Sequence, residues 1–201
     1  MSAPSVSNSA GDDTVLVAQA KGGYLEAFDQ LVLRHQQVVF AVALRMLGSH
    51  DDAEDVAQEA FVRAYRSLGA FRGEAKFSTW LVSITMNLCR NRRRWWARHR
   101  RAIVASTDDP LETGEGTLGQ RIEDPSPSPS TVAVSRERQR QIEDALRQLD
   151  EDHRSVIVLR DIEGYAYEEI AGMLGCRVGT VKSRINRARL KLRSLLEGQL
   201  T

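Results

Sequence analysis

A strongly basic stretch near the end of the chain carries side chains suited to reading DNA. Residues 177–193 contain seven Lys or Arg residues and no acidic one, although the net charge of the whole chain is only +1. Clustered cations neutralise phosphates, and hydroxyl, amide and guanidinium groups can reach base edges in a major groove. Such groups recur on one helical face, at Thr180, Ser183, Asn186 and Arg187. The alternative interpretation is a solvated basic face on an ordinary helix.

The surrounding pattern predicts how this face is presented. Residues 167–174 place apolar side chains at helical spacing, and Gly175 suits the left-handed conformation that ends a helix. Residues 178–193 repeat apolar side chains at spacings of four, three and four, which form one stripe. The stripe consists of Val181, Ile185, Ala188 and Leu192. Two helices joined by a tight turn predict a DNA-reading helix-turn-helix, which argues against the solvated-face interpretation.

A second basic block lies in the first half of the chain. Residues 71–105 contain nine basic residues and one acidic residue, concentrated between Arg90 and Arg101. A helix that begins near Ser78 leads into this run, and three tryptophans lie among its polar residues and cations: Trp80, Trp95 and Trp96. Phosphates attract arginines and unstacked bases lie on aromatic rings, so the mixture favours a site for single-stranded nucleic acid. Alternatively, Trp80 and one of the paired tryptophans fill the core, and the arginines form a solvated helix end.

The sequence before this block predicts two more helices. A dense apolar pattern covers Leu25 to Leu47, and Gly48 ends it. Residues 49–52 resemble a capping box for a helix that continues to Leu68. One face of this second helix is apolar, and its other face offers polar groups to solvent or to a partner. These are Asp55, Gln58, Glu59 and Arg63.

The pattern as a whole predicts an all-α protein made of two small helical domains joined by a flexible acidic linker. The first domain spans residues 15–102, after a disordered tail at 1–14. The second, residues 134–201, is a four-helix domain that contains the helix-turn-helix. The linker, residues 103–133, is rich in Pro, Ser, Gly and acidic residues and cannot form a core. Taken by itself, the sequence of this segment favours a simple spacer.

Several classes of protein are disfavoured. No apolar run reaches the 18 or so residues of a membrane span, and the first dozen residues lack the parts of a signal peptide. We therefore expect a cytoplasmic protein without membrane insertion. Cys89 and Cys176 show no metal-binding spacing, the histidines show no i, i+4 pairing, and capping explains the cluster at His50. We expect no metal, no cofactor and no catalytic residue.

Several motifs together resemble a known family. In chain order they are DAEDVAQEAFVRAYR at 52–66, FRGE at 71–74, FSTWL at 77–81 with Asn87, and YEEIA at 167–171 with VGTVKSR at 178–184. Their order and spacing resemble bacterial RNA polymerase sigma factors of the extracytoplasmic-function (ECF) group, over residues 22–196. The resemblance implies a promoter-specificity subunit that binds core RNA polymerase, recognises two promoter elements and helps to open the duplex.

The resemblance also implies roles for individual residues. Asp55, Gln58 and Glu59 match the face that presses against the clamp helices of the largest polymerase subunit, and the polymerase flap is a further expected contact. Asn87 matches the residue that reads a flipped base of the minus-ten element. The other residues expected at that melted element are Trp80, Arg92, Arg93 and Arg94. The residues expected at the minus-thirty-five duplex are Arg160, Tyr167, Glu168, Thr180, Lys182, Ser183, Asn186 and Arg187.

Further partners and some departures follow from the same resemblance. The family threads its linker through polymerase, is masked by anti-sigma factors, and associates with the nucleoid when bound to polymerase. Asp150 and Arg177 stand where the family often has proline. The pair Trp95 and Trp96 and the dense arginine cluster are stronger than the usual family pattern. The rival hypothesis is a stand-alone helix-turn-helix regulator, which would explain residues 135–196 but gives the first basic helix no role.

Overall fold

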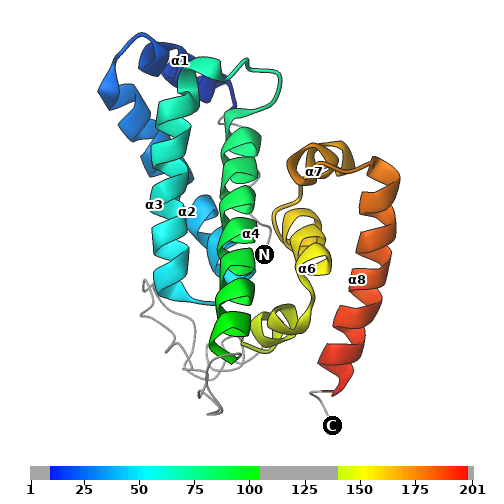
Figure 1. Cartoon of the computed structure of the whole chain (residues 1–201). Coiled ribbons are helices and arrows are strands. Elements are labelled where there is room, and N and C mark those ends of the chain that lie inside the picture. Colours follow the sequence, from blue (N-terminus) through cyan, green and yellow to red (C-terminus); the bar gives the residue numbers. More distant parts are fainter. Residues whose placement is uncertain (1–9, 105–139, 199–201) are drawn as a thin grey trace, which may run out of the picture.

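The computed structural model describes residues 10–104 and 140–198, and every regular element within these ranges is helical. This result confirms the predicted all-α fold (Figure 1). Residues 105–133 of the predicted linker lie outside the described ranges. The elements are α1 (Ala10–Lys21), α2 (Leu25–Leu47), α3 (His50–Ser67), the 3-10 turn η2 (Leu68–Ala70), α4 (Phe77–Val104), a helix at 140–148, α6 (Glu151–Ile157), the π-helical turn η3 (Val158–Ile162), α7 (Tyr167–Leu174) and α8 (Val178–Gly198).

Helices α2 and α3 begin and end within one residue of their predicted positions. Gly48 ends α2 with φ of 75°, and its N–H donates to the carbonyl of Leu44 at 2.7 Å. The Ser49 hydroxyl then accepts the backbone N–H of Asp52 at 3.4 Å, which caps α3. The local signals in the sequence are therefore sufficient to define this pair of helices.

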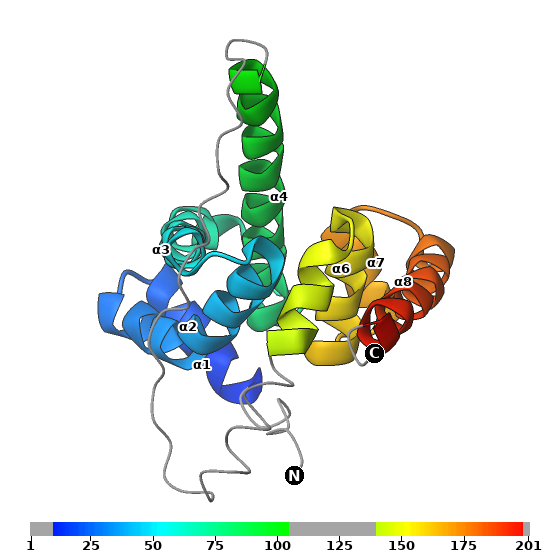
Figure 2. The ribbon, with the colours of Figure 1, turned by 90° about the horizontal axis from the view of Figure 1, so that it is seen from below.

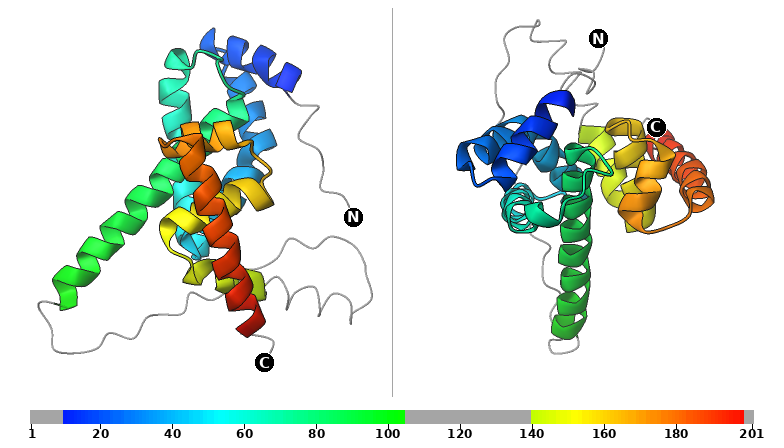
Figure 3. Two further views of the ribbon diagram at one scale, coloured as in Figure 1. Left: turned by 90° about the vertical axis from the view of Figure 1, so that its right-hand side faces the viewer. Right: turned by 90° about the horizontal axis from the view of Figure 1, so that it is seen from above.

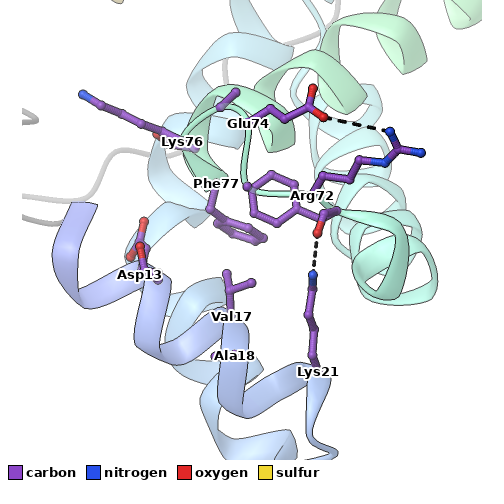
Figure 4. A pocket seen from close by; sticks show the side chains of 13 residues that line it. Asp13, Val17, Ala18, Lys21, Arg72, Glu74, Lys76 and Phe77 are labelled. Atoms are coloured by element: carbon purple, nitrogen blue, oxygen red, sulfur yellow. Dashed lines mark hydrogen bonds and ion pairs between the residues drawn. The ribbon is translucent and has the colours of Figure 1, made fainter.

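Helix α1 begins at Ala10, inside the segment 1–14 that the sequence predicts as a tail. Asp13 is only 5% exposed, and its carboxylate lies 2.8 Å from the His35 ring and 3.3 Å from the Arg34 guanidinium. Lys21, at the other end of α1, donates to the carbonyl of Phe71. A pocket of about 480 Å³ lies between α1 and the loop at 72–76 (Figure 4). Helix α1 thereby fixes the loop from which α4 starts.

Helix α4 has 28 residues and is therefore about 42 Å long. Its first half packs against α2, α3 and α7 through buried side chains such as Leu81, Met86 and Leu88. Its last turns stand clear of the other helices (Figure 2; Figure 3). One helix thus combines a packed half with a projecting half.

The C-terminal half contains the predicted helix-turn-helix. Gly175 takes φ of 62° at the end of α7, and Val181, Ile185 and Ala188 of α8 are buried. Before it, the Asp150 carboxylate accepts the backbone N–H of His153 at 3.0 Å and caps α6. A side-chain cap therefore sets the helix start at Asp150, one of the two positions where the sequence departs from the family that it resembles.

The two halves share one apolar core, which contains buried side chains from both. Helix α7 packs against α4, and α6 packs against α2. Arg154 of α6 is 2% exposed and donates to carbonyl oxygens from both halves. The acceptors are Met46 at 2.8 Å, Leu146 at 2.7 Å, Leu149 at 2.9 Å and Arg147 at 2.5 Å.

Removing the Arg154 side chain should strongly destabilise the protein. Arg154→Ala removes a buried charged donor from four carbonyls. The Met46 carbonyl keeps Arg93 and the Leu146 carbonyl keeps the Leu149 N–H as donors, but the other two lose Arg154 without such a substitute. Hydrogen bonds to a charged group contribute about 1.5–3 kcal/mol each, so the total loss should be about 3–5 kcal/mol. The free energy of unfolding in urea measures this loss. Arg177→Ala, at an exposed position, should change it by no more than about 0.5 kcal/mol. Equal values for both variants would show that Arg154 does not hold the structure together.

Candidate nucleic-acid and polymerase surfaces

The outward face of α8 presents the side chains predicted to read duplex DNA. Lys182, Ser183, Asn186 and Arg187 are exposed, and Thr180 is half-buried. Ser183 Oγ donates to the Thr180 carbonyl at 3.0 Å, which orients that hydroxyl toward its own helix. The face therefore combines an amide, a guanidinium and an ammonium group within two turns.

Three of the predicted upstream-element residues form one aromatic and cationic cluster between η3, α7 and α8. The Tyr167 ring lies 4.7 Å from the Arg160 guanidinium and 5.7 Å from Lys182 Nζ. Arg160 also donates to the Tyr165 carbonyl at 2.8 Å. Burial raises the pKa of Tyr165 well above its usual range, so this phenol stays neutral. Glu168 is exposed on α7.

The seven cations of residues 177–193 are not equally available. Four of them pair with carboxylates: Arg184 with Asp152 at 2.5 Å, Arg189 with Asp161 at 2.5 Å, Lys191 with Asp150 at 3.5 Å, and Arg193 with Glu197 at 2.7 Å. The hydrogen bond to Asp161 raises the pKa of Arg189. Within the described residues, Arg177, Lys182 and Arg187 have no carboxylate partner. The available charge therefore lies in the first half of α8.

On α4, Asn87 is exposed and Trp80 is half-buried. The Trp80 ring lies 4.8 Å from the Phe71 ring and 5.7 Å from the Phe77 ring, and it packs against the core. Much of the Trp80 ring therefore contacts the core, in agreement with the alternative interpretation of this residue. Asn87 offers its amide to solvent, and Trp95 is 48% exposed.

Two of the three arginines predicted at the melted strand have partners within the fold. Arg92 pairs with Asp52 and Asp55, each at 2.8 Å, and the hydrogen bond to Asp52 raises the pKa of Arg92. Arg93 donates to the Met46 carbonyl at 2.9 Å. Arg94 is exposed. From the sequence, Asp52 is recognisable only as part of a helix start. Its pairing with Arg92 could not be predicted, because the two residues lie 40 positions apart.

The predicted polymerase face lies along α3, where Asp55, Gln58 and Glu59 are all exposed. Glu59 pairs with Arg63 one turn later, at 2.6 Å. Asp55 holds Arg92 and so connects this face to α4. Acidic and amide groups in a row can pair with basic residues of a partner helix.

The described residues offer little for other chemistry. Burial raises the pKa of Cys89 to about 12, which keeps that thiol protonated and unreactive. Cys176 is half-buried in the other half of the chain. Among the residues described, no three His, Cys, Asp or Glu side chains lie together as a metal site would require. None of their helices is both long and apolar enough to cross a membrane.

Comparison with known proteins matches both halves of the chain. The family models for sigma-70 region 2 and sigma-70 region 4 match residues 31–101 and 139–192. The RNA polymerase sigma-H factor of Pseudomonas aeruginosa is 39% identical over 180 residues, which cover 88% of this chain and 90% of that protein. The ECF RNA polymerase sigma-E factor of Escherichia coli (strain K12) is 38% identical with the same coverage.

Solved structures agree with these matches. The structure of CnrH in complex with the cytosolic domain of CnrY has a TM-score of 0.65 and 33% identity, and the match covers 92% of this chain and 97% of that one. The sigma factor RpoE of Bartonella quintana, solved with the anti-sigma factor NepR, has a TM-score of 0.63 and 27% identity, with coverage of 85% and 96%.

The fold and its polar surfaces define a two-part helical protein with a helix-turn-helix in its second half. The matches on both halves identify the kind of protein more closely. The chain belongs to the bacterial sigma-70 family of RNA polymerase sigma factors, in the ECF group. It is therefore a transcription initiation factor, as its motifs predicted.

Proposed function

We propose that this sigma factor holds core polymerase on a promoter through residues of both halves. The observation that supports this most strongly is that exposed base-reading side chains occur on two helices from different halves, α4 and α8. Helix α8 presents Lys182, Asn186 and Arg187 to the minus-thirty-five duplex, with the Arg160 and Tyr167 cluster beside them. Helix α4 presents Asn87 to a flipped base of the melted minus-ten element. The polymerase face is Asp55, Gln58 and Glu59.

This assignment requires the two halves to separate on the promoter. By their names the two elements lie about 25 base pairs apart, which is about 85 Å at 3.4 Å per pair. Helix α4 packs against α7, and α7 packs against α8. Because packed helix axes lie about 8–10 Å apart, the two reading helices lie within about 30 Å of each other. The compact arrangement cannot reach both elements together.

The proposal includes an anti-sigma partner that covers the polymerase face and the reading helices. The Bartonella relative was solved with such a factor, and α3 of this chain offers an exposed polar row to a partner. We assign the chain no reaction of its own, since polymerase performs the synthesis. We place it in the cytoplasm, and at the nucleoid when it is bound to polymerase. The passage of the acidic linker through polymerase stays a prediction.

Run-off transcription tests the proposed function. Purified core polymerase plus this chain should give discrete promoter-dependent transcripts from fragments of the source genome, and core polymerase alone should not. The experiment also separates this function from that of a stand-alone regulator, which would bind duplex DNA tightly without polymerase. No transcript above the level of core polymerase alone would refute the proposal.

Arg187→Ala should weaken the binding of holoenzyme to promoter DNA more than Arg189→Ala. Both variants lose one positive charge from α8, but Arg189 is already held by Asp161. If Arg187 is bidentate to a guanine, its loss should cost about 1–3 kcal/mol and relax specificity at that base. Competition binding against single-base promoter variants measures both effects. Equal, sequence-independent losses would instead assign Arg187 to phosphate contact alone.

Asn87→Ala should impair strand opening and leave upstream binding intact. Its amide can donate to and accept from a base edge only after the strand has melted. Permanganate reactivity of thymines in the minus-ten region should fall, while protection of the upstream element persists. Asn91→Ala, one turn further along the same helix and also exposed, is the matched control and should open DNA normally. Normal opening by Asn87→Ala would remove this residue from the site.

A further inference from the structure

Helix α1 is fastened at both ends to a group of aromatic rings that leads to Trp80. We call His35, Phe71, Phe77 and Trp80 the ring cluster. Ring centroids lie 5.5 Å apart for His35 and Phe77, 5.7 Å apart for Phe77 and Trp80, and 4.8 Å apart for Phe71 and Trp80. Phe71 and Phe77 are buried, and Trp80 is half-buried. The polymerase and DNA contacts proposed above give α1 no role.

Asp13, in the first turns of α1, holds the His35 end of the ring cluster. Its carboxylate is 5% exposed, and Oδ2 lies 2.8 Å from His35 Nε2. The His35 ring in turn packs against Phe77, the first residue of α4. Because a buried polar group is costly to leave without its partner, this contact keeps the His35 ring against the start of α4.

Lys21, at the last turn of α1, holds the Phe71 end. Its Nζ donates to the carbonyl oxygen of Phe71 and lies 5.7 Å from the centre of the Phe71 ring. Figure 4 shows the Lys21 side chain reaching from α1 to this carbonyl, whereas Lys76 extends in another direction. A charged donor on a carbonyl and a cation near an aromatic ring each favour one placement of the partner. The Phe71 ring, which lies against Trp80, is therefore held from α1.

Trp80 is the member of the ring cluster that the family resemblance places at the melted minus-ten strand. The Phe71 ring lies against one part of its indole at 33°, and the rest of the half-buried ring remains partly open to solvent. Unpaired bases stack on aromatic rings. Binding costs less when the ring is already fixed in the bound orientation. A Trp80 ring held from α1 is thus oriented before a base arrives.

We propose that Asp13 and Lys21 are positioning residues for strand opening, which hold the Trp80 ring in the orientation on which an unpaired base stacks. The inference rests on the proposed function, in which the N-terminal half captures the melted minus-ten element. Neither residue needs to touch DNA. Helix α1, whose start the sequence predicted as a tail, thereby takes part in promoter melting.

The test compares holoenzymes with single substitutions on a promoter that the wild-type holoenzyme selects. Lys21→Met removes the ammonium group and keeps most of the aliphatic stem. It should lower permanganate reactivity at the minus-ten element. It should also weaken binding to a single-stranded minus-ten oligonucleotide by about fivefold, the lower end of what one stacked base contributes. Asp13→Asn should give the same defect from the other end of α1. Protection of the upstream element and assembly with core polymerase should not change.

Lys76→Met is the matched control. Lys76 is exposed and lines the same pocket as Lys21, so this substitution removes the same charge nearby, and opening should stay normal. An equal defect in Lys76→Met would show that the lost charge matters and the contact with Phe71 does not. For Lys21→Met, the slope of log K against log salt should match the wild type. A slope shallower by about 0.7 would assign Lys21 to a direct phosphate contact and overturn the inference.

Two further measurements separate positioning from other roles. In a Trp80→Leu background, Lys21→Met should cause little further loss, because both changes act on the same ring. A full additional loss would show that Lys21 acts elsewhere. The urea midpoint of Lys21→Met should match the wild type, since this residue is exposed. A lowered midpoint with equal losses at both promoter elements would assign α1 to stability alone. Failure of the proposed function itself is distinct, because wild-type holoenzyme would then select no promoter.

Discussion

A single buried guanidinium organises the C-terminal half and its position beside α2. Arg154 is 2% exposed, and its hydrogen bonds go to the carbonyl oxygens at the ends of two helices, α2 and the helix at 140–148. The last carbonyls of a helix lack intrahelical partners and carry partial negative charge. One cation therefore completes both helix ends. The helix-turn-helix is built on α6, so its placement depends on the same side chain.

Intramolecular carboxylates determine which cations are free for DNA. On α8, acidic residues from α6, η3 and α8 itself hold four of the seven cations. On α4, the arginines nearest the body are likewise engaged. Exposed ion pairs contribute at most about 1 kcal/mol, so DNA can compete for them, but the unpaired cations are available without that cost. The cations of one basic stretch of sequence therefore differ in the structure, since some are paired with carboxylates and others are available to DNA.

Local signals made much of this fold predictable, and distant contacts made the rest unpredictable. Gly48, Ser49 and Gly175 mark helix ends through their own conformation or hydrogen bonding, and apolar periodicity gave the helix-turn-helix. The start of α1 could not be predicted, because Asp13 is held by His35, 22 residues away. The engagement of Arg92 depends on Asp52 and Asp55, 40 and 37 residues away. The sequence identifies these residues but not their pairing.

The contacts between the two halves are of a kind that can be exchanged. Beside the shared apolar core, they include two polar contacts, Arg45 with Glu163 at 2.8 Å and Thr79 with Glu169 at 2.9 Å. If the halves part, Arg154 loses Met46 but keeps three carbonyl acceptors within its own half. The Met46 carbonyl in turn keeps Arg93 as its donor. Arg154 and the Met46 carbonyl therefore each keep partners within their own half, so the hydrogen bonds that Arg154 makes inside the C-terminal half do not depend on contact with α2.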